Sequence, residues 1–213
     1  MKRSEATAEA PPQSVSRLDE KRADKTQRIV TAGLTLFAER GFHGTSIPDI
    51  CKEANVAAGT IYRYFESKEA LVNAVFRASK ARLRDCLFDG LDTKAAPRSL
   101  FRDFFWRLVA FARSCPTDFA FLEMQDHIPY LDRESRDLEI AVLAPIWLVL
   151  LEHRNNGVMK EVRPEIVIGM VWGALVGLMK GERMGYFKVT EQDLVDAEQA
   201  CWDGMIRRAG GTN

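Results

Sequence analysis

The sequence has few of the residues that build metal sites or disulfide frameworks. Its 213 residues include four cysteines and three histidines, and no histidine lies at metal-ligand spacing from a cysteine. This scatter argues against a bound metal, and no cofactor is expected. No apolar segment follows Met1 as it would in a secretory signal. A cytoplasmic protein is therefore predicted, with free thiols at Cys51, Cys86, Cys115 and Cys201.

The chain also lacks an excess of charge of either sign. Lysine plus arginine and aspartate plus glutamate both number 30, so the formal net charge is zero. Such a molecule has little long-range attraction for a polyanion, and any contact with nucleic acid must be local. The longest apolar run, residues 166–179, is shorter than the roughly 20 residues that cross a bilayer. It is interpreted as a buried helix, and no membrane partner is expected.

Strand patterns are missing as well, because no segment shows sustained two-residue alternation of apolar and polar side chains. Helical periodicity dominates from Arg22 onward, which predicts an all-α protein of about nine helices. Residues 1–20 hold two prolines and almost no large apolar side chain, so a disordered arm is expected there. A helix-turn-helix domain is predicted for 21–70 and a larger helical bundle for 71–213. A loop near 89–97 precedes the bundle's main helices.

Local signals mark the helices of the first domain. An apolar face including Ile29 and Phe37 predicts a helix over 25–40, and Gly41 can end it in the left-handed conformation. Ser46 with Asp49 forms a capping box that predicts a second helix to about residue 54. A turn at 55 leads to a third short helix over 58–64, and a cap at 67 opens a fourth. Two short helices joined by a tight turn and braced by a first helix are typical of DNA-binding helix-turn-helix units.

The stretch RIVTAGLTLFAERGFHGTSIPDICKEANVAAGTIYRYFESKEALV resembles the DNA-binding domain of the TetR family of transcription regulators. The resemblance implies a ligand-controlled repressor that binds a palindromic operator as a homodimer. Three positions depart from the family pattern: Cys51 replaces alanine, Asn55 replaces glycine, and Ala57 replaces a capping serine. Losing that cap costs the third helix about 1 kcal/mol. The matching residues are Leu36, Phe37, Gly41, Phe42, Thr45, Ser46, Ile47, Ile50, Ala54, Val56, Gly59, Thr60, Ile61, Tyr62, Tyr64, Phe65, Ser67 and Lys68.

The residues of this motif offer groups that a double-stranded DNA operator can use. Gly59 permits close approach of the backbone to a phosphate, and Arg63 is the best candidate for a bidentate contact with guanine. Hydroxyl groups and a lysine near helix N-termini suit phosphate contacts. Packing of Tyr62 or Tyr64 into the core is the alternative for each tyrosine. The predicted DNA-contacting residues are Thr45, Ser46, Ala58, Gly59, Thr60, Tyr62, Arg63, Tyr64 and Lys68.

The last two predicted helices, 164–186 and the one opened by Thr190 and Asp193, carry an interface pattern. Glycines recur every four residues along the first, and they permit close helix contact at about 1 kcal/mol each relative to alanine. Apolar residues with a seven-residue spacing follow on the second. By resemblance to the family, these helices form the dimer. Packing of the glycine row within one subunit stays open. The predicted interface residues are Gly169, Gly173, Gly177, Gly181, Leu194, Cys201, Trp202 and Met205.

A small-molecule effector is expected to bind among large apolar groups of the second domain. Pro145 should kink its helix and open space. Glu123, Asp126 and His127 could orient a polar end of the ligand, although a surface or structurally bonded role for His127 is the alternative. The predicted ligand-binding residues are Phe105, Phe121, Met124, His127, Trp147 and Trp172.

Other functions find less support in the sequence. It has no phosphate-binding glycine loop, nucleophile elbow or metal-spaced histidine pair, so an enzyme is not predicted. The Glu123 and His127 pair, one helical turn apart, is the nearest approach to a catalytic pattern. An architectural DNA-binding protein of the same fold, without ligand control, is the alternative to the repressor.

Overall fold

The computed structural model describes residues 17–57 and 59–207. Eight α-helices and two 3-10 helices account for the described part of the chain, which contains no strand beyond one isolated bridge. The all-α prediction is confirmed. The helices are α1 (Arg17–Arg40), α2 (Ile47–Glu53), η1 (Ile61–Arg63), α3 (Lys68–Phe88), α4 (Pro97–Ser114), α5 (Pro116–Met124), η2 (Ile128–Tyr130), α6 (Arg133–Asn155), α7 (Pro164–Arg183) and α8 (Glu191–Met205).

The first helix is longer than the sequence pattern predicted. α1 begins at Arg17, although its periodic face begins near Lys25. Asp19 and Glu20 lie in its first turn, where negative charge interacts favourably with the helix dipole. The predicted disordered arm was therefore wrong over 17–20, and its remaining residues, 1–16, lie outside the described part of the chain.

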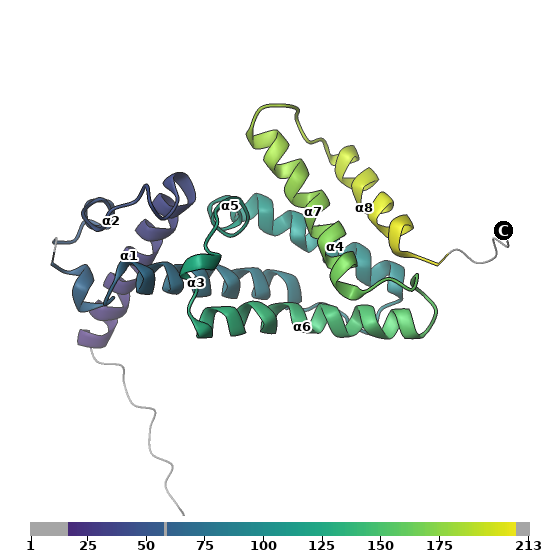
Figure 1. Cartoon of the computed structure of the whole chain (residues 1–213), viewed down its shortest axis with the longest axis horizontal. Coiled ribbons are helices and arrows are strands. Elements are labelled where there is room, and N and C mark those ends of the chain that lie inside the picture. The colour runs from purple at the N-terminus through teal and green to yellow at the C-terminus, as the bar shows by residue number, and fades with distance from the viewer. Residues whose placement is uncertain (1–16, 58, 208–213) are drawn as a thin grey trace, which may run out of the picture.

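Two hydrophobic clusters support the fold. The head cluster joins α1, α2, η1 and the first half of α3, and it includes Phe37 and Ile50, both fully buried. The body cluster joins the second half of α3 with α4, α7 and α8 around Phe105 and Leu194. α3 runs through both without interruption, as Figure 1 shows. The head is therefore held on the body by a continuous helix.

α5 forms a second connection between the two clusters. Phe121 of α5 is buried in the head cluster, 6.4 Å from the ring of Phe37. Leu122 and Met124 are half-buried and pack against both clusters. In Figure 1, α5 lies between the head and α7. A displacement of α5 would therefore disturb the packing of both the head cluster and the body cluster.

α6 lies along α3 and continues past Pro145 to Asn155. Lys80 and Glu139 join the two helices with an ion pair of 3.1 Å.

α7 and α8 form an antiparallel pair beside α4 (Figure 1). Arg98 of α4 forms an ion pair with the buried Glu198 of α8.

Candidate DNA-binding surface and ligand cavity

The turn of the helix-turn-helix lies between α2 and η1, and its local conformation follows from a capping box before α2 and an asparagine after it. The capping box of Ser46 and Asp49 is present at the start of α2, which confirms that prediction. After α2, Asn55 adopts a left-handed conformation with a φ of 50°. Arg28 of α1 donates hydrogen bonds of 2.6 and 2.8 Å to the carbonyl oxygens of Ala54 and Asn55. The turn is therefore clamped from α1, a contact that no local sequence pattern indicated.

Two of the predicted DNA contacts are occupied within the head. Thr45 is 1% exposed, and its hydroxyl donates to the carbonyl oxygens of Leu36 and Gly41. The Lys68 ammonium donates to the carbonyl oxygens of Phe42 and Thr45 at 2.7 and 2.8 Å, and it lies 4.1 Å from the centre of the Phe42 ring. Both side chains fix the loop between α1 and α2, which uses the Thr45 hydroxyl and two of the three N–H groups of the Lys68 ammonium.

The segment beyond the turn presents an exposed surface. Tyr62 is 61% exposed, and the exposed Arg63 side chain forms no hydrogen bond or ion pair with another described residue. A Cβ at Gly59 would meet no atom within 4 Å. Ser46 is also exposed, with its hydroxyl bonded to Asp49. Tyr64 is half-buried against the head cluster, Thr60 is half-buried at the N-cap of η1, and Ala58 lies outside the described residues.

The predicted helix over 58–64 is shorter in the structure. Within the described part of this range, 59–64, only Ile61–Arg63 is helical, with 3-10 geometry, and no side chain caps its first turn. The backbone N–H groups of Thr60 and Arg63 bond to the carbonyl oxygens of residues three positions earlier, at 2.8 and 3.1 Å. An alanine at 57 provides no oxygen to cap a longer helix, which explains the short turn. Tyr62 and Arg63 nevertheless project from it.

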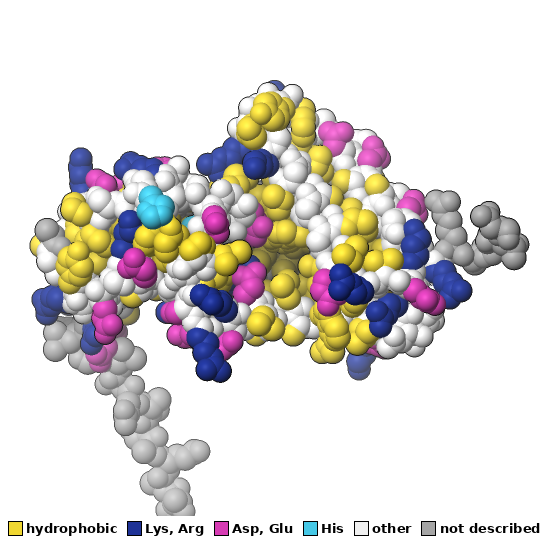
Figure 2. All heavy atoms as spheres, viewed as in Figure 1, with side chains coloured by type: hydrophobic (Ala, Val, Ile, Leu, Met, Phe, Trp, Pro, Cys, Tyr) yellow, Lys and Arg dark blue, Asp and Glu magenta, His cyan; other side chains and the backbone are white. Residues whose placement is uncertain are grey.

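A cavity of about 630 Å³ lies in the body of the molecule. Most of its lining is aliphatic or aromatic, from α3, α4, α5, α6 and α7. Figure 2 shows the hollow near the middle of the face, with hydrophobic side chains at its floor and acidic groups at its edge. Its size and apolar walls match those of small-molecule sites in proteins.

Two of the six predicted ligand-binding residues, His127 and Trp172, line this cavity. Phe105 and Phe121 are fully buried in the body and head clusters instead. Met124 packs between the clusters, and Trp147 donates its indole N–H to Glu165 at the surface. Helical periodicity shows which residues are buried, but it does not separate a core-facing side chain from one that faces a cavity.

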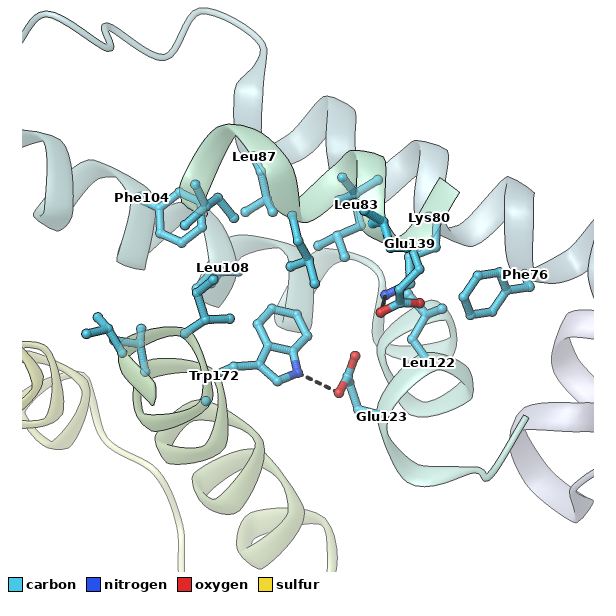
Figure 3. Close-up of a pocket in the computed structure, with 18 of the residues that line it drawn as sticks. Phe76, Lys80, Leu83, Leu87, Phe104, Leu108, Leu122, Glu123, Glu139 and Trp172 are labelled. Atoms are coloured by element: carbon cyan, nitrogen blue, oxygen red, sulfur yellow. Dashed lines mark hydrogen bonds and ion pairs between the residues drawn. The ribbon is translucent and has the colours of Figure 1, made fainter. Parts of the chain in front are cut away.

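A group of polar residues lines part of the cavity, and the sequence indicated two of them, Glu123 and His127, but not Lys80 or Glu139. We call it the polar wall: Lys80, Glu123, His127 and Glu139. Figure 3 shows Lys80 and Glu139 together, with Glu123 near them and in contact with Trp172. Trp172 donates its indole N–H to Glu123 at 2.5 Å. Burial raises the pKa of the Glu123 carboxyl, and the bond from Trp172 opposes this shift.

His127 is 4% exposed and stacks on Phe121 with the ring centres 3.9 Å apart. Its Nε2 lies 2.6 Å from the carbonyl oxygen of Phe121, so this nitrogen carries the proton and donates. Nδ1 is buried without a hydrogen-bond partner among the described residues. Burial lowers the pKa of the imidazole, against the effects of the Phe121 carbonyl and Asp126. The ring is therefore a neutral acceptor at Nδ1.

The segment that carries Glu123 and His127 of the polar wall also contacts the head. Gln125 donates to the carbonyl oxygen of Ala38 at 3.0 Å. Tyr130 stacks on Phe42 with ring centres 3.8 Å apart, and its hydroxyl lies 2.6 Å from Nε2 of His43. One short stretch, residues 121–131, therefore borders both the cavity and the end of α1.

The predicted dimer residues divide into two groups. Leu194, Cys201 and Met205 are buried in the body cluster, and Trp202 packs on Phe101 of α4. Leu194, Cys201 and Met205 therefore face their own subunit, whereas Trp202 is half-buried. Gly169, Gly173 and Gly177 are exposed on α7, with nothing within 4 Å of an added Cβ, whereas Gly181 is covered by Phe187.

Apolar side chains accompany these glycines on the outer face of α7. Ile166 is 52% exposed and Met170 is 38% exposed. By length and composition α7 could cross a membrane, and 33% of its apolar window is buried. One such helix is weak evidence for a membrane span, because core and interface helices pass the same test. The prediction of a buried helix holds for only part of its surface.

The fold and these sites define a helix-turn-helix protein whose body encloses an apolar cavity. Residues 29–75 match the profile described as bacterial regulatory proteins of the tetR family. Residues 76–207 match a tetracyclin repressor-like C-terminal domain. The chain belongs to the TetR family, as its helix-turn-helix motif predicted.

Individual proteins show where the likeness lies. The transcriptional regulator UidR of Escherichia coli K12 is 42% identical over 55 residues, which are 26% of this chain and 28% of that one. A TetR-family protein of Vibrio parahaemolyticus aligns with a TM-score of 0.72 and 27% identity over 86% of this chain and all of that one. FadR of Bacillus subtilis in complex with stearoyl-CoA aligns with a TM-score of 0.66 and 19% identity, covering 83% and 95%. The sequence match to UidR thus spans under a third of that regulator. The structural alignments span nearly the full length of the Vibrio parahaemolyticus protein and of FadR.

Proposed function

We propose that the protein is a transcriptional repressor that binds a palindromic DNA operator as a homodimer. The exposed pair of Tyr62 and Arg63 carries this proposal, because both project from η1, which follows the turn that Arg28 holds through the carbonyl oxygens of Ala54 and Asn55. A rigid mount positions side chains precisely enough for base contacts in the major groove. Lys52 and Arg40 are exposed on the same head and suit phosphate contacts.

The outer face of α7 supports the dimer. Ile166, Met170 and the open glycines Gly169, Gly173 and Gly177 leave an apolar strip without a cover in the single subunit. A second copy of the strip would bury the apolar groups and bring two helices into close contact at the glycines. Of the predicted interface residues, this proposal keeps Gly169, Gly173 and Gly177 and does not require the buried Leu194, Cys201 and Met205.

The cavity supports control by a small apolar or amphipathic effector. Such a ligand would stabilise one arrangement of the two heads over another. Release follows when the recognition segments no longer match the spacing of about 34 to 36 Å between successive major-groove half-sites. The solved FadR structure holds stearoyl-CoA, so a related fold accommodates an amphipathic ligand with a long apolar chain.

The direct test is an anisotropy titration of the full chain against duplexes from the DNA upstream of its own gene, with random DNA as competitor. Binding should be sequence-selective, nanomolar and salt-sensitive. The Tyr62→Ala, Arg63→Ala double variant should lose at least tenfold in operator affinity with its unfolding midpoint unchanged. As a matched control, Tyr186→Ala with Arg133→Ala removes an exposed tyrosine and arginine outside the head. Equal micromolar binding to operator and random DNA would overturn the proposal.

A further inference from the structure

The cations of the cavity are already engaged. Lys80 is 7% exposed, and its Nζ forms the ion pair with Glu139. Arg136, at the exposed side of the cavity, donates from Nε and Nη2 to the carbonyl oxygen of Leu131 at 2.9 and 2.6 Å. A carboxylate entering the polar wall would find its buried cation neutralised, with Glu123 and Glu139 beside it.

The atoms of the polar wall that remain open are mostly acceptors. Oε2 of Glu123 accepts the indole N–H of Trp172, whereas Oε1 has no hydrogen bond to a described residue. Nδ1 of His127 is a second acceptor without a partner. On the donor side, Lys80 hydrogen-bonds with one described residue, Glu139, although an ammonium has three N–H groups. The wall therefore offers acceptors together with a spare donor.

A hydroxyl group satisfies both kinds of atom, since it donates one hydrogen bond and accepts others. A ketone accepts only, and would leave Glu123 and His127 without a donor. Lys80 and Glu139 already neutralise each other, and burial disfavours charge on Glu123, so an alkylammonium or a carboxylate end would be buried without a free counter-charge. The aliphatic and aromatic lining of the remaining cavity favours an apolar body for the same molecule.

We propose that the cavity binds an uncharged apolar molecule whose polar end is a hydroxyl group, held between Glu123 and Lys80. The inference rests on the proposed role of the cavity as an effector site and names the chemical class of that effector. Burial disfavours charge at this wall, since it raises the pKa of Glu123 and lowers that of His127.

The experiment is isothermal calorimetry on the full chain without DNA, using probes with one ten-carbon chain: 1-decanol, 2-decanone, decanoate and decylamine. 4-Butylphenol separates an aromatic from an aliphatic hydroxyl. One of the two hydroxyl probes should bind at least tenfold more tightly than decanoate, decylamine and 2-decanone. Equal or tighter binding of any probe without a hydroxyl, or binding of none, would overturn this ligand class. Operator binding measured separately would still stand, so failure here is distinct from failure of the regulator proposal.

Variants locate the preference at the polar wall. Glu123→Gln keeps an acceptor for Trp172 and adds an N–H donor that suits a carboxylate, so the preference for the hydroxyl probe over decanoate should fall to under threefold. Glu165→Gln is the matched control, because Glu165 accepts the indole N–H of Trp147 at 3.0 Å on the surface. An unchanged preference in Glu123→Gln, or an equal loss in Glu165→Gln, would contradict the assignment.

Discussion

Asn55 holds the turn between α2 and η1 in a left-handed backbone conformation, with a φ of 50°. Most residues with a Cβ pay about 1 to 2 kcal/mol for this conformation, and asparagine pays less because its amide can bond locally. Asn55→Ala should therefore lower the free energy of unfolding by about 1 kcal/mol, and Asn55→Gly should leave it unchanged or raise it. Urea unfolding of the three proteins checks this. Equal stability of all three would show that the turn is unstrained.

Replacing Lys68 should lower folding stability, whereas replacing Arg63 should lower operator affinity. Lys68→Met removes the bonds to the carbonyl oxygens of Phe42 and Thr45, and it should cost about 1 to 3 kcal/mol of folding stability. Arg63→Ala removes an exposed side chain, so stability should change by under about 0.5 kcal/mol. Operator binding should instead weaken by about 1 to 3 kcal/mol. Thermal unfolding and anisotropy, run on both variants, separate the two roles.

His127 should make stability depend on pH. Its pKa is lowered in the fold because burial disfavours the charged ring. The unfolded chain therefore binds the proton more readily, and stability that is complete above the ordinary histidine pKa is lost as the pH falls below it. Between pH 7.5 and pH 5.5, His127→Gln should lose less stability than the natural chain does. A parallel pH dependence in both proteins would contradict this.

The exposed face of α7 that carries Gly169, Gly173 and Gly177 is the dimer interface proposed above. A glutamate at Gly173 has open space around it, so Gly173→Glu should fold. In a dimer the same charge would be buried without a partner, at a cost of several kcal/mol. Sedimentation should show a dimer for the natural chain and a monomer for this variant. Ala23→Glu, on the exposed side of α1, is the control and should remain dimeric.

Helix ends were the most predictable elements, because each depends on a few neighbouring residues. The caps at Ser46, Ser67 and Thr190 are all present in the structure. The left-handed glycine after α1 is present too, with a φ of 68° at Gly41. The helix expected over 58–64 was wrong in extent, since nothing caps it. Local signals fix where a helix begins and ends more firmly than whether a short one forms.

At the scale of the whole molecule, prediction was limited by distance along the chain. Lys80 and Glu139 are 59 residues apart, and Trp172 is 49 residues from Glu123. No periodic pattern connects such positions, so the sequence indicated Glu123 and His127 but not their neighbours Lys80 and Glu139, which only the packing of α3 and α6 brings to the cavity. The same limit hid the clamp by Arg28 and placed Phe105 and Phe121 in a cavity that they do not line.

The stretch of residues 121–131 should transmit occupancy of the cavity to the head. Hydrogen exchange with a bound probe, 1-decanol or 4-butylphenol, should show protection in α5 and also at the end of α1, near Ala38. Tyr130→Phe keeps the ring stack on Phe42 and removes the hydroxyl contact with His43. It should reduce protection near Ala38 and leave protection in α5 intact. Protection confined to the cavity in the natural chain would exclude this route.

The clamps within the head also bear on how a regulator finds its target on a chromosome. Arg28 and Lys68 donate to backbone carbonyl oxygens of the head instead of extending freely toward DNA. The formal net charge of the whole chain is zero. Attraction to arbitrary DNA grows with the number of phosphates neutralised, so the protein should hold only weakly to the many competing sites of a genome. Its search should then proceed by repeated free diffusion with short sliding runs, and few copies per cell would be sequestered away from the operator.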